Sequence, residues 1–142
     1  MTVQFATETE SDLAPVLKFV TPMPGFPEHD EFVLLRIADQ DLLYALTSMQ
    51  DPELRFLVMP PAGFFPDYTP EVDDDTLEML GSHEADDLLV MLVVTPGSSA
   101  REATANLLAP IIIDQRRRCA LQAVLAGSGL PVRAPLMAGA GV

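Results

Sequence analysis

The chain of 142 residues has one cysteine, one lysine and no apolar run long enough to cross a membrane. The single cysteine excludes an internal disulfide and argues against a cysteine-based zinc site. It lies in Cys119-Ala120-Leu121-Gln122-Ala123-Val124-Leu125, where we interpret it as a small core residue and not as a reactive thiol. The longest apolar runs, such as residues 88–94, are far shorter than the roughly 20 residues of a membrane helix.

Basic residues are also scarce: eight face 21 acidic ones, for a formal net charge of −13. Nucleic acids and anionic membranes repel such a chain, so we expect no direct contact with either. The charge favours a basic protein partner, although composition alone also fits a charge that serves solubility. The first twelve residues are polar and lack the basic start and apolar stretch of a signal peptide, which predicts a cytoplasmic protein.

Short apolar runs rich in Val, Ile, Leu and Phe indicate β-strands. Two of the turns between them, Asp39-Gln40-Asp41 and Gln50-Asp51-Pro52, are short enough for antiparallel hairpins. We therefore predict an all-β, mainly antiparallel fold, a small barrel-like domain or, alternatively, a sandwich. One domain is expected over residues 1–142, with a core from about 13 to 136 and frayed ends. The predicted strands are 32–38, 42–48, 54–59, 88–95, 107–113 and 119–125.

One short helix is expected, with a second short turn near Ser82 or Glu84. An aspartate among residues 73–75 can cap a helix over residues 76–80, and Gly81 suits the left-handed position that ends it. Because a helix of one or two turns is not stable alone, it must pack on the sheet.

The stretch Thr104-Ala105-Asn106-Leu107-Leu108-Ala109-Pro110-Ile111-Ile112-Ile113 places an amide and a proline in an apolar run. A buried Asn106 must find partners for its side chain, because an unpaired polar group in a core costs about 1–3 kcal/mol. Pro110 cannot donate a hydrogen bond to a neighbouring strand, so the strand is an edge or is broken there. We predict a kinked strand with a structural asparagine.

Nine acidic residues lie between Asp67 and Asp87, with no Lys or Arg among them. Three consecutive aspartates do not alternate as calcium ligands do in an EF-hand loop, and the mid-loop glycine is missing, so we expect no metal and no cofactor. Helix capping and a solvated face account for part of these acids. We predict that the rest contact a basic partner; the candidates are Asp67, Glu71, Asp73, Asp74, Asp75 and Glu78.

Two proline-containing loops, residues 24–27 and 64–68, carry four aromatic rings. Rigid loops lose little entropy on binding, and aromatic side chains are favoured anchors at protein interfaces. Alternatively, the phenylalanines plug the ends of the barrel. Tyr68 is expected to be the most exposed ring, because polar residues flank it. The candidate anchors are Phe26, Phe64, Phe65 and Tyr68.

Sequence patterns of catalysis are missing. The chain has no Gly-x-Ser-x-Gly, no His-Glu-x-x-His and no phosphate-binding glycine loop. The acids lie in polar segments without the desolvated carboxylate that an acid-pair hydrolase requires. His29 and His83 are expected at the surface. Three arginines, 116–118, are too few for a nucleic-acid face and are expected to form a turn that pairs with local acids, or one end of a partner interface.

Several of these segments together resemble the FliW family of flagellar assembly factors. Asn106 and Pro110 fall in a match to its Thr-Ala-Asn-Leu-x-Ala-Pro-Ile stretch, and Pro24-Gly25-Phe26 looks like its Pro-Gly-Phe turn. Gln50-Asp51-Pro52 is similar to its central hairpin. Residues 64–68, Arg133 and Pro135-Leu136 follow in the family's order. Two positions depart from it: Pro22-Met23-Pro24-Gly25-Phe26-Pro27 stands where the family usually has Gly-Leu-Pro-Gly-Phe-Glu, and Leu108 where it often has lysine.

The resemblance implies a non-enzymatic regulator with a small barrel-like fold. It also implies two partners: CsrA, a basic RNA-binding repressor of translation, and newly made flagellin. Binding to CsrA would relieve repression of flagellin synthesis, and accumulating flagellin would reclaim the factor. The alternative is a small acidic barrel that serves another basic or aggregation-prone protein as a chaperone.

Overall fold

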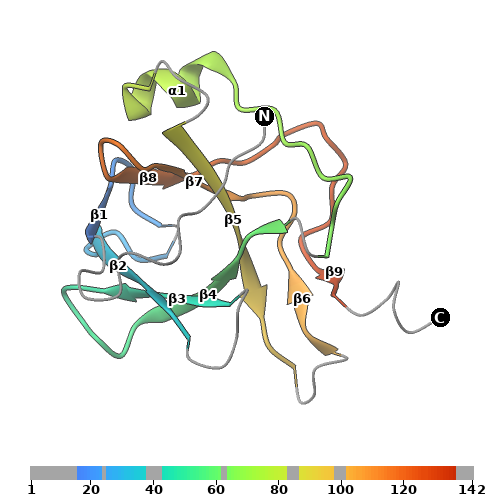
Figure 1. Cartoon of the computed structure of the whole chain (residues 1–142), viewed down its shortest axis with the longest axis horizontal. Helices are drawn as coiled ribbons and strands as arrows, with labels where there is room; N and C mark the ends of the chain where they lie inside the picture. The colour runs from blue at the N-terminus through green and yellow to red at the C-terminus, as the bar shows by residue number, and fades with distance from the viewer. Residues whose placement is uncertain are drawn as a thin grey trace.

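The computed structural model describes residues 16–23, 25–37, 43–61, 64–82, 87–97 and 102–136, and its strands form one sheet (Figure 1). In chain order the elements are β1 (Val16–Phe19), β2 (Glu31–Arg36), β3 (Tyr44–Ser48), β4 (Arg55–Met59), α1 (Asp74–Leu80), β5 (Leu88–Thr95), β6 (Thr104–Ala105), β7 (Ile111–Asp114), β8 (Cys119–Gln122) and β9 (Ala134–Pro135).

Seven of these strands close into a barrel. The order β4-β3-β2-β1-β8-β7-β5 is completed by pairing of β4 with β5. The β1–β8 pair is parallel and the other pairs are antiparallel. β5 pairs with β7 through its first half and with β6 through its last two residues, and β9 continues the sheet beyond β6. The predicted all-β, mainly antiparallel barrel is confirmed, and so is its helix.

The two predicted hairpins are antiparallel pairs, β2 with β3 and β3 with β4. The turn Asp39-Gln40-Asp41 lies outside the described residues, whereas Gln50-Asp51-Pro52 is described and joins β3 to β4. The predicted strand over 107–113 is wrong in its first part, because β7 begins only at Ile111. The predicted strand over 119–125 ends at Gln122.

Asn106 and Pro110 explain the interrupted strand. The Asn106 side-chain Oδ1 accepts hydrogen bonds from the backbone N–H groups of Leu108 and Ala109, each at 3.0 Å, which folds the chain out of the sheet. The backbone N–H of Asn106 donates to the carbonyl of Val93 at 2.9 Å and keeps the segment beside β5. The prediction of a structural asparagine and a break at Pro110 is confirmed.

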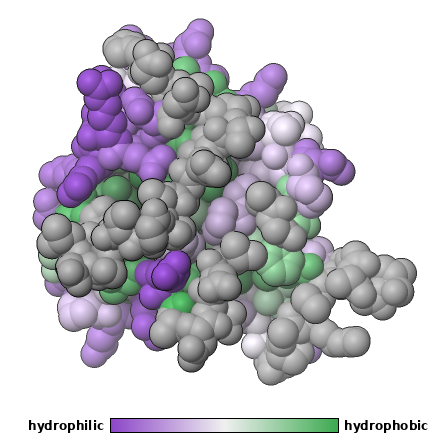
Figure 2. Space-filling view, in the orientation of Figure 1, coloured by the Kyte–Doolittle hydropathy of each residue, from purple (hydrophilic) through white to green (hydrophobic). Residues whose placement is uncertain are grey.

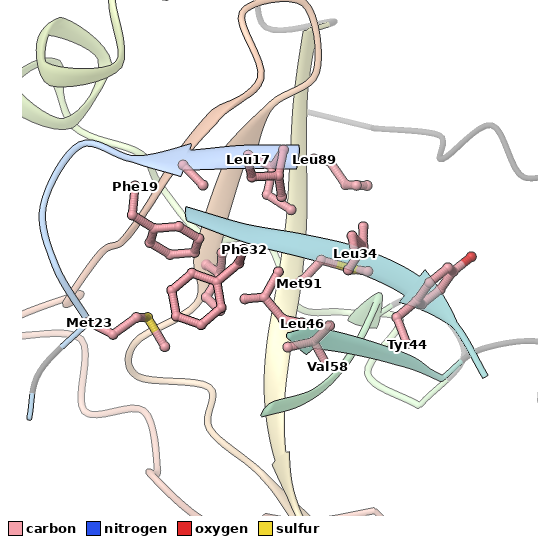
Figure 3. Packing of buried hydrophobic residues seen from close by; sticks show 13 residues of the cluster. Leu17, Phe19, Met23, Phe32, Leu34, Tyr44, Leu46, Val58, Leu89 and Met91 are labelled. Carbon is pink, nitrogen blue, oxygen red and sulfur yellow. The ribbon is translucent and has the colours of Figure 1, made fainter. Parts of the chain in front are cut away.

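The barrel interior is filled by one apolar cluster (Figure 3). Phe32 of β2 points inward beside Phe19 of β1, and the two rings meet edge to face with centroids 5.1 Å apart. Leu34 points inward farther along β2. Alternation continues along β5, where Leu89 and Met91 belong to this cluster. Their neighbours face the other way, so β5 is buried on both faces and its sequence is apolar from Leu88 to Val94.

A second cluster lies outside the barrel, against α1. It contains Leu80 of the helix, Leu88, Ile112, Leu121 and Cys119. The predicted core role of the cysteine is confirmed: it is buried, and its thiol donates to the Leu80 carbonyl at 3.4 Å. A third cluster, which includes Met59, Leu92, Ala105 and Leu107, fills the space between the barrel and β9.

The helix is capped as predicted. Asp73 is the N-cap, and its side chain accepts from the Thr76 backbone N–H at 2.9 Å. Gly81 ends the helix at φ 72°, in the left-handed region that favours glycine. The expected second turn near Glu84 lies outside the described residues. Among the residues described, no helix has the length and apolar character needed to cross a membrane.

Candidate protein-binding surface

The six acidic candidates lie in one continuous segment from Asp67 to Glu78, called the acidic segment below, and all six are exposed. It runs from the loop after β4 into α1. Hydrogen bonds from Thr76 hold the pKa of Asp73 below its ordinary value. Asp73 therefore serves the helix as its cap, while Asp74 and Asp75 in the first turn complement the helix dipole. In Figure 2 hydrophilic residues gather toward the end of the barrel that carries α1.

The aromatic loop beside the acidic segment is more buried than the sequence predicted. Tyr68 was expected to be the most exposed ring, but it is half-buried, and its hydroxyl donates to the Leu107 carbonyl at 2.7 Å. Burial raises the pKa of Tyr68 to about 12. Phe65 is half-buried and packs with Tyr68 against the third cluster, whereas Phe64 is 40% exposed. Phe64 is thus the ring of this loop that is open to a partner.

The other aromatic candidate, Phe26, belongs to a different part of the molecule. It packs against the barrel interior, with its ring edge to face on Phe56 at 5.6 Å between centroids. Its neighbour His29 is half-buried and not a surface residue as predicted, because its Nδ1 lies 2.7 Å from the hydroxyl of Ser48. The two aromatic loops pack on separate clusters and do not form one set of anchors. His83 lies outside the described residues.

A buried carboxylate, Asp114, was not among the residues predicted from the sequence. It ends β7 with no exposed surface and accepts from the Ser82 hydroxyl. It also accepts from the backbone N–H groups of Arg116 and Arg117 at 3.0 Å each, and from Arg117 Nη1 at 3.2 Å. Burial favours the neutral acid, but these hydrogen bonds outweigh it and lower the pKa of Asp114. The predicted turn of arginines paired with a local acid is confirmed, and Asp114 is the acid that organises it.

The sequence carried one signal for this role: Asp114 stands between three isoleucines and an arginine turn, a place where a side chain can accept from the next backbone N–H groups. Its contact with Ser82, which follows the C-terminal end of α1, joins residues 32 positions apart and has no local signal in the sequence.

A groove of about 940 Å³, called the α1 groove below, opens between the acidic segment and the chain after β8. Residues 69–73 and 76–77 form one wall, Leu88 lies at its base, and residues 123–128 with Leu130 form the other wall. Glu71 and Asp73 are the charged residues among the described lining, and neither is basic. No group of three or more His, Cys, Asp or Glu side chains within the described ranges is placed to hold a metal ion.

A sequence model described as the FliW protein matches residues 1–136. The chain belongs to the FliW family. The flagellar assembly factor FliW of Bacillus licheniformis is 33% identical over 129 residues, which cover 91% of this chain and 90% of the relative. That of Bacillus subtilis is 34% identical over 121 residues, 85% of each chain. A crystal structure of the flagellar assembly factor FliW superimposes with a TM-score of 0.81 at 31% identity, covering 86% of this chain and 85% of that one.

The FliW-like motifs of this chain build its fold. Gly25 adopts φ 90°, which other residues rarely take, and Pro24 before it lies outside the described residues. In the central hairpin, the Ser48 hydroxyl accepts from the backbone N–H groups of Gln50 and Asp51 at 3.0 and 3.2 Å. Asp51 in turn accepts from the Glu53 N–H at 3.0 Å, which turns the chain at Pro52. These residues therefore shape the turns that connect the strands.

The two departures from the FliW pattern are also located. In the first turn Met23 is buried in the barrel interior, while Pro22 and Pro27 are exposed. Leu108, where the family often has lysine, is half-buried, and its carbonyl accepts from the Leu125 N–H at 2.8 Å. The Leu108 backbone thus supports one wall of the α1 groove.

Proposed function

We propose that this chain is a non-enzymatic regulator of flagellar assembly that binds two partners in the cytoplasm. One partner is CsrA, whose repression of translation it relieves, and the other is flagellin, which competes for it. The observation that carries the proposal is membership of the FliW family over residues 1–136, whose members are named as flagellar assembly factors.

The charge of the molecule supports a basic partner such as CsrA. The net charge is −13, and the acidic segment presents six exposed carboxylates without an intervening Lys or Arg. Complementary charge accelerates encounter and selects among partners more than it adds affinity, and it weakens with salt. A regulator that exchanges partners benefits from fast association of this kind.

Titration calorimetry of the purified protein against CsrA and flagellin from the same organism tests the proposal. We expect binding at micromolar concentrations or tighter to each, and displacement of one by the other. Binding to neither would overturn the function. Binding to flagellin alone would leave a chaperone without a regulatory role.

The same acidic surface also fits a chaperone for another basic or aggregation-prone protein. Deletion of the gene separates the two functions. A regulator predicts loss of motility together with reduced flagellin translation, whereas an unrelated chaperone leaves flagellin translation unchanged.

A further inference from the structure

One side of the α1 groove is formed by α1 and the residues before it, which pack on the second cluster through Val72, Leu77 and Leu80. Leu80, in the last turn, is buried on the second cluster, and the Cys119 thiol donates to its carbonyl. In the first turn Asp74 and Asp75 are exposed to solvent, whereas Thr76 is buried and lines the groove. The α1 groove lies between this part of the chain and the segment after β8.

The opposite wall presents an exposed apolar side chain, Val124. Val124 is 64% exposed, the highest fraction among the large hydrophobic residues that the structure describes. It is held in place by its neighbours, because the Ala123 and Leu125 N–H groups donate to the carbonyls of Pro110 and Leu108 at 2.9 and 2.8 Å. Val72 and Leu77 on the helix side are half-buried. A concave groove lined by apolar side chains together with a few polar groups is typical of a binding site.

We infer that the α1 groove binds a segment of the basic partner that carries apolar side chains next to Lys or Arg. Glu71 and Asp73 on the rim supply negative charge, and Val72, Leu77 and Val124 supply apolar contacts. No basic residue among the described lining would repel such a segment. This inference rests on the proposed function, because it assigns CsrA, the basic partner, to the groove.

Two matched pairs of variants in the full-length chain test the assignment, with calorimetry against CsrA as the readout. Val124→Lys removes an apolar contact and places a positive charge in the groove. Met79→Lys makes a similar change at a residue that is 51% exposed on α1 but does not line the groove. Both variants change the net charge equally, so a general loss of attraction affects them alike.

We expect Val124→Lys to weaken CsrA binding at least about tenfold and Met79→Lys to weaken it less than about threefold. In the second pair, Glu71→Gln should weaken CsrA binding roughly two- to fivefold at low salt and leave it unchanged at high salt. Glu53→Gln, at an exposed acid in the β3–β4 hairpin, should leave CsrA binding unchanged at both salt concentrations. Thermal unfolding of each variant confirms that it is folded.

The outcomes separate the groove from the function. If the unmodified protein does not bind CsrA, the proposed function fails and the assignment with it. If it binds CsrA and both members of each pair bind equally, the function stands and the groove assignment is overturned. If Val124→Lys converts a dimer to a monomer and CsrA binding stays intact, the groove binds a second copy of the chain. If Val124→Lys weakens flagellin binding and CsrA binding stays intact, the groove binds flagellin. Either result would overturn the assignment of the groove to CsrA.

Discussion

Replacing Asp114 by asparagine tests whether a buried carboxylate holds the end of β7. Oδ1 accepts from two backbone N–H groups, and Oδ2 accepts from the Ser82 hydroxyl and from Arg117 Nη1. In the asparagine, one oxygen can still accept from the backbone. The amide nitrogen takes the place of Oδ2. It can donate to the Ser82 hydroxyl, which can accept, but it cannot bond to Arg117, because a guanidinium group has no acceptor.

The magnitude follows from these contacts. A hydrogen bond to a charged group contributes about 1.5–3 kcal/mol, and the Arg117 bond belongs at the lower end because its side chain is 40% exposed. The carboxylate charge also strengthens the bonds that remain in the variant. We expect Asp114→Asn to lower the free energy of unfolding by about 2–3 kcal/mol at neutral pH.

The pH dependence gives a second test. The pKa of Asp114 is lower in the folded protein than in the unfolded chain, where it is about 3.9. The contribution of the carboxylate to the free energy of unfolding is therefore complete above about pH 4 and is lost as the pH falls below the unfolded pKa and through the folded one. The difference between the two proteins should therefore be the same at pH 7 and pH 5 and shrink below about pH 4.

Denaturant unfolding followed by far-UV circular dichroism is the assay, because the chain has no tryptophan. Asp67→Asn, at an exposed acid, is the control and should stay within about 0.5 kcal/mol of the unmodified protein. A loss below about 1 kcal/mol, or a difference that persists unchanged into strong acid, would refute the assigned role of Asp114.

Four further substitutions have expected outcomes. Asn106→Ala removes the acceptor of two backbone N–H groups and should lower the free energy of unfolding by about 1–2 kcal/mol in denaturant titration. Tyr68→Phe removes the bond to the Leu107 carbonyl and should cost about 0.5–1.5 kcal/mol. Because the native pKa of Tyr68 is raised to about 12, its contribution is complete below pH 10 and is lost between pH 10 and 12. Phe64→Ala should leave the melting temperature unchanged, whereas Phe65→Ala should lower it.

Each of these changes can fail in a recognisable way. An Asn106→Ala protein as stable as the original would mean that its turn forms without the side chain. A Tyr68→Phe protein that loses stability at alkaline pH as fast as the original would show that this phenol does not titrate as expected. Equal melting temperatures for the two phenylalanine variants would contradict their different burial.

Six of the strands were predicted because their signal is local, whereas β1 and the two-residue strands β6 and β9 were not predicted. β2 to β5 fall in the apolar runs, and their ends coincide with turn residues whose backbone preferences act over a few positions. The cap at Asp73 and the stop at Gly81 are local in the same way. The predicted strand over 107–113 was too long because apolar residues also fill the Asn106 turn, where hydrogen bonding and not hydropathy sets the path.

The exposure of the acidic residues in the candidate site was predictable from the sequence, but the burial of its aromatic side chains was not. All six acids are exposed, as residues in a polar segment tend to be. Tyr68 lies among polar neighbours in the sequence, yet the carbonyl that accepts its hydroxyl belongs to Leu107, 39 positions away. No local pattern reports on such a partner.

The sequence by itself determined the family, the strand-rich fold, the capped helix and the acidic segment, because motifs, hydropathy and charge are properties of neighbouring residues. Only the tertiary structure decided barrel closure, which requires β4 to meet β5 and β1 to meet β8. It also decided the burial of Asp114 beneath Ser82 and the groove between α1 and the chain after β8. These features join residues far apart in the chain, and their positions follow from how the whole sheet closes.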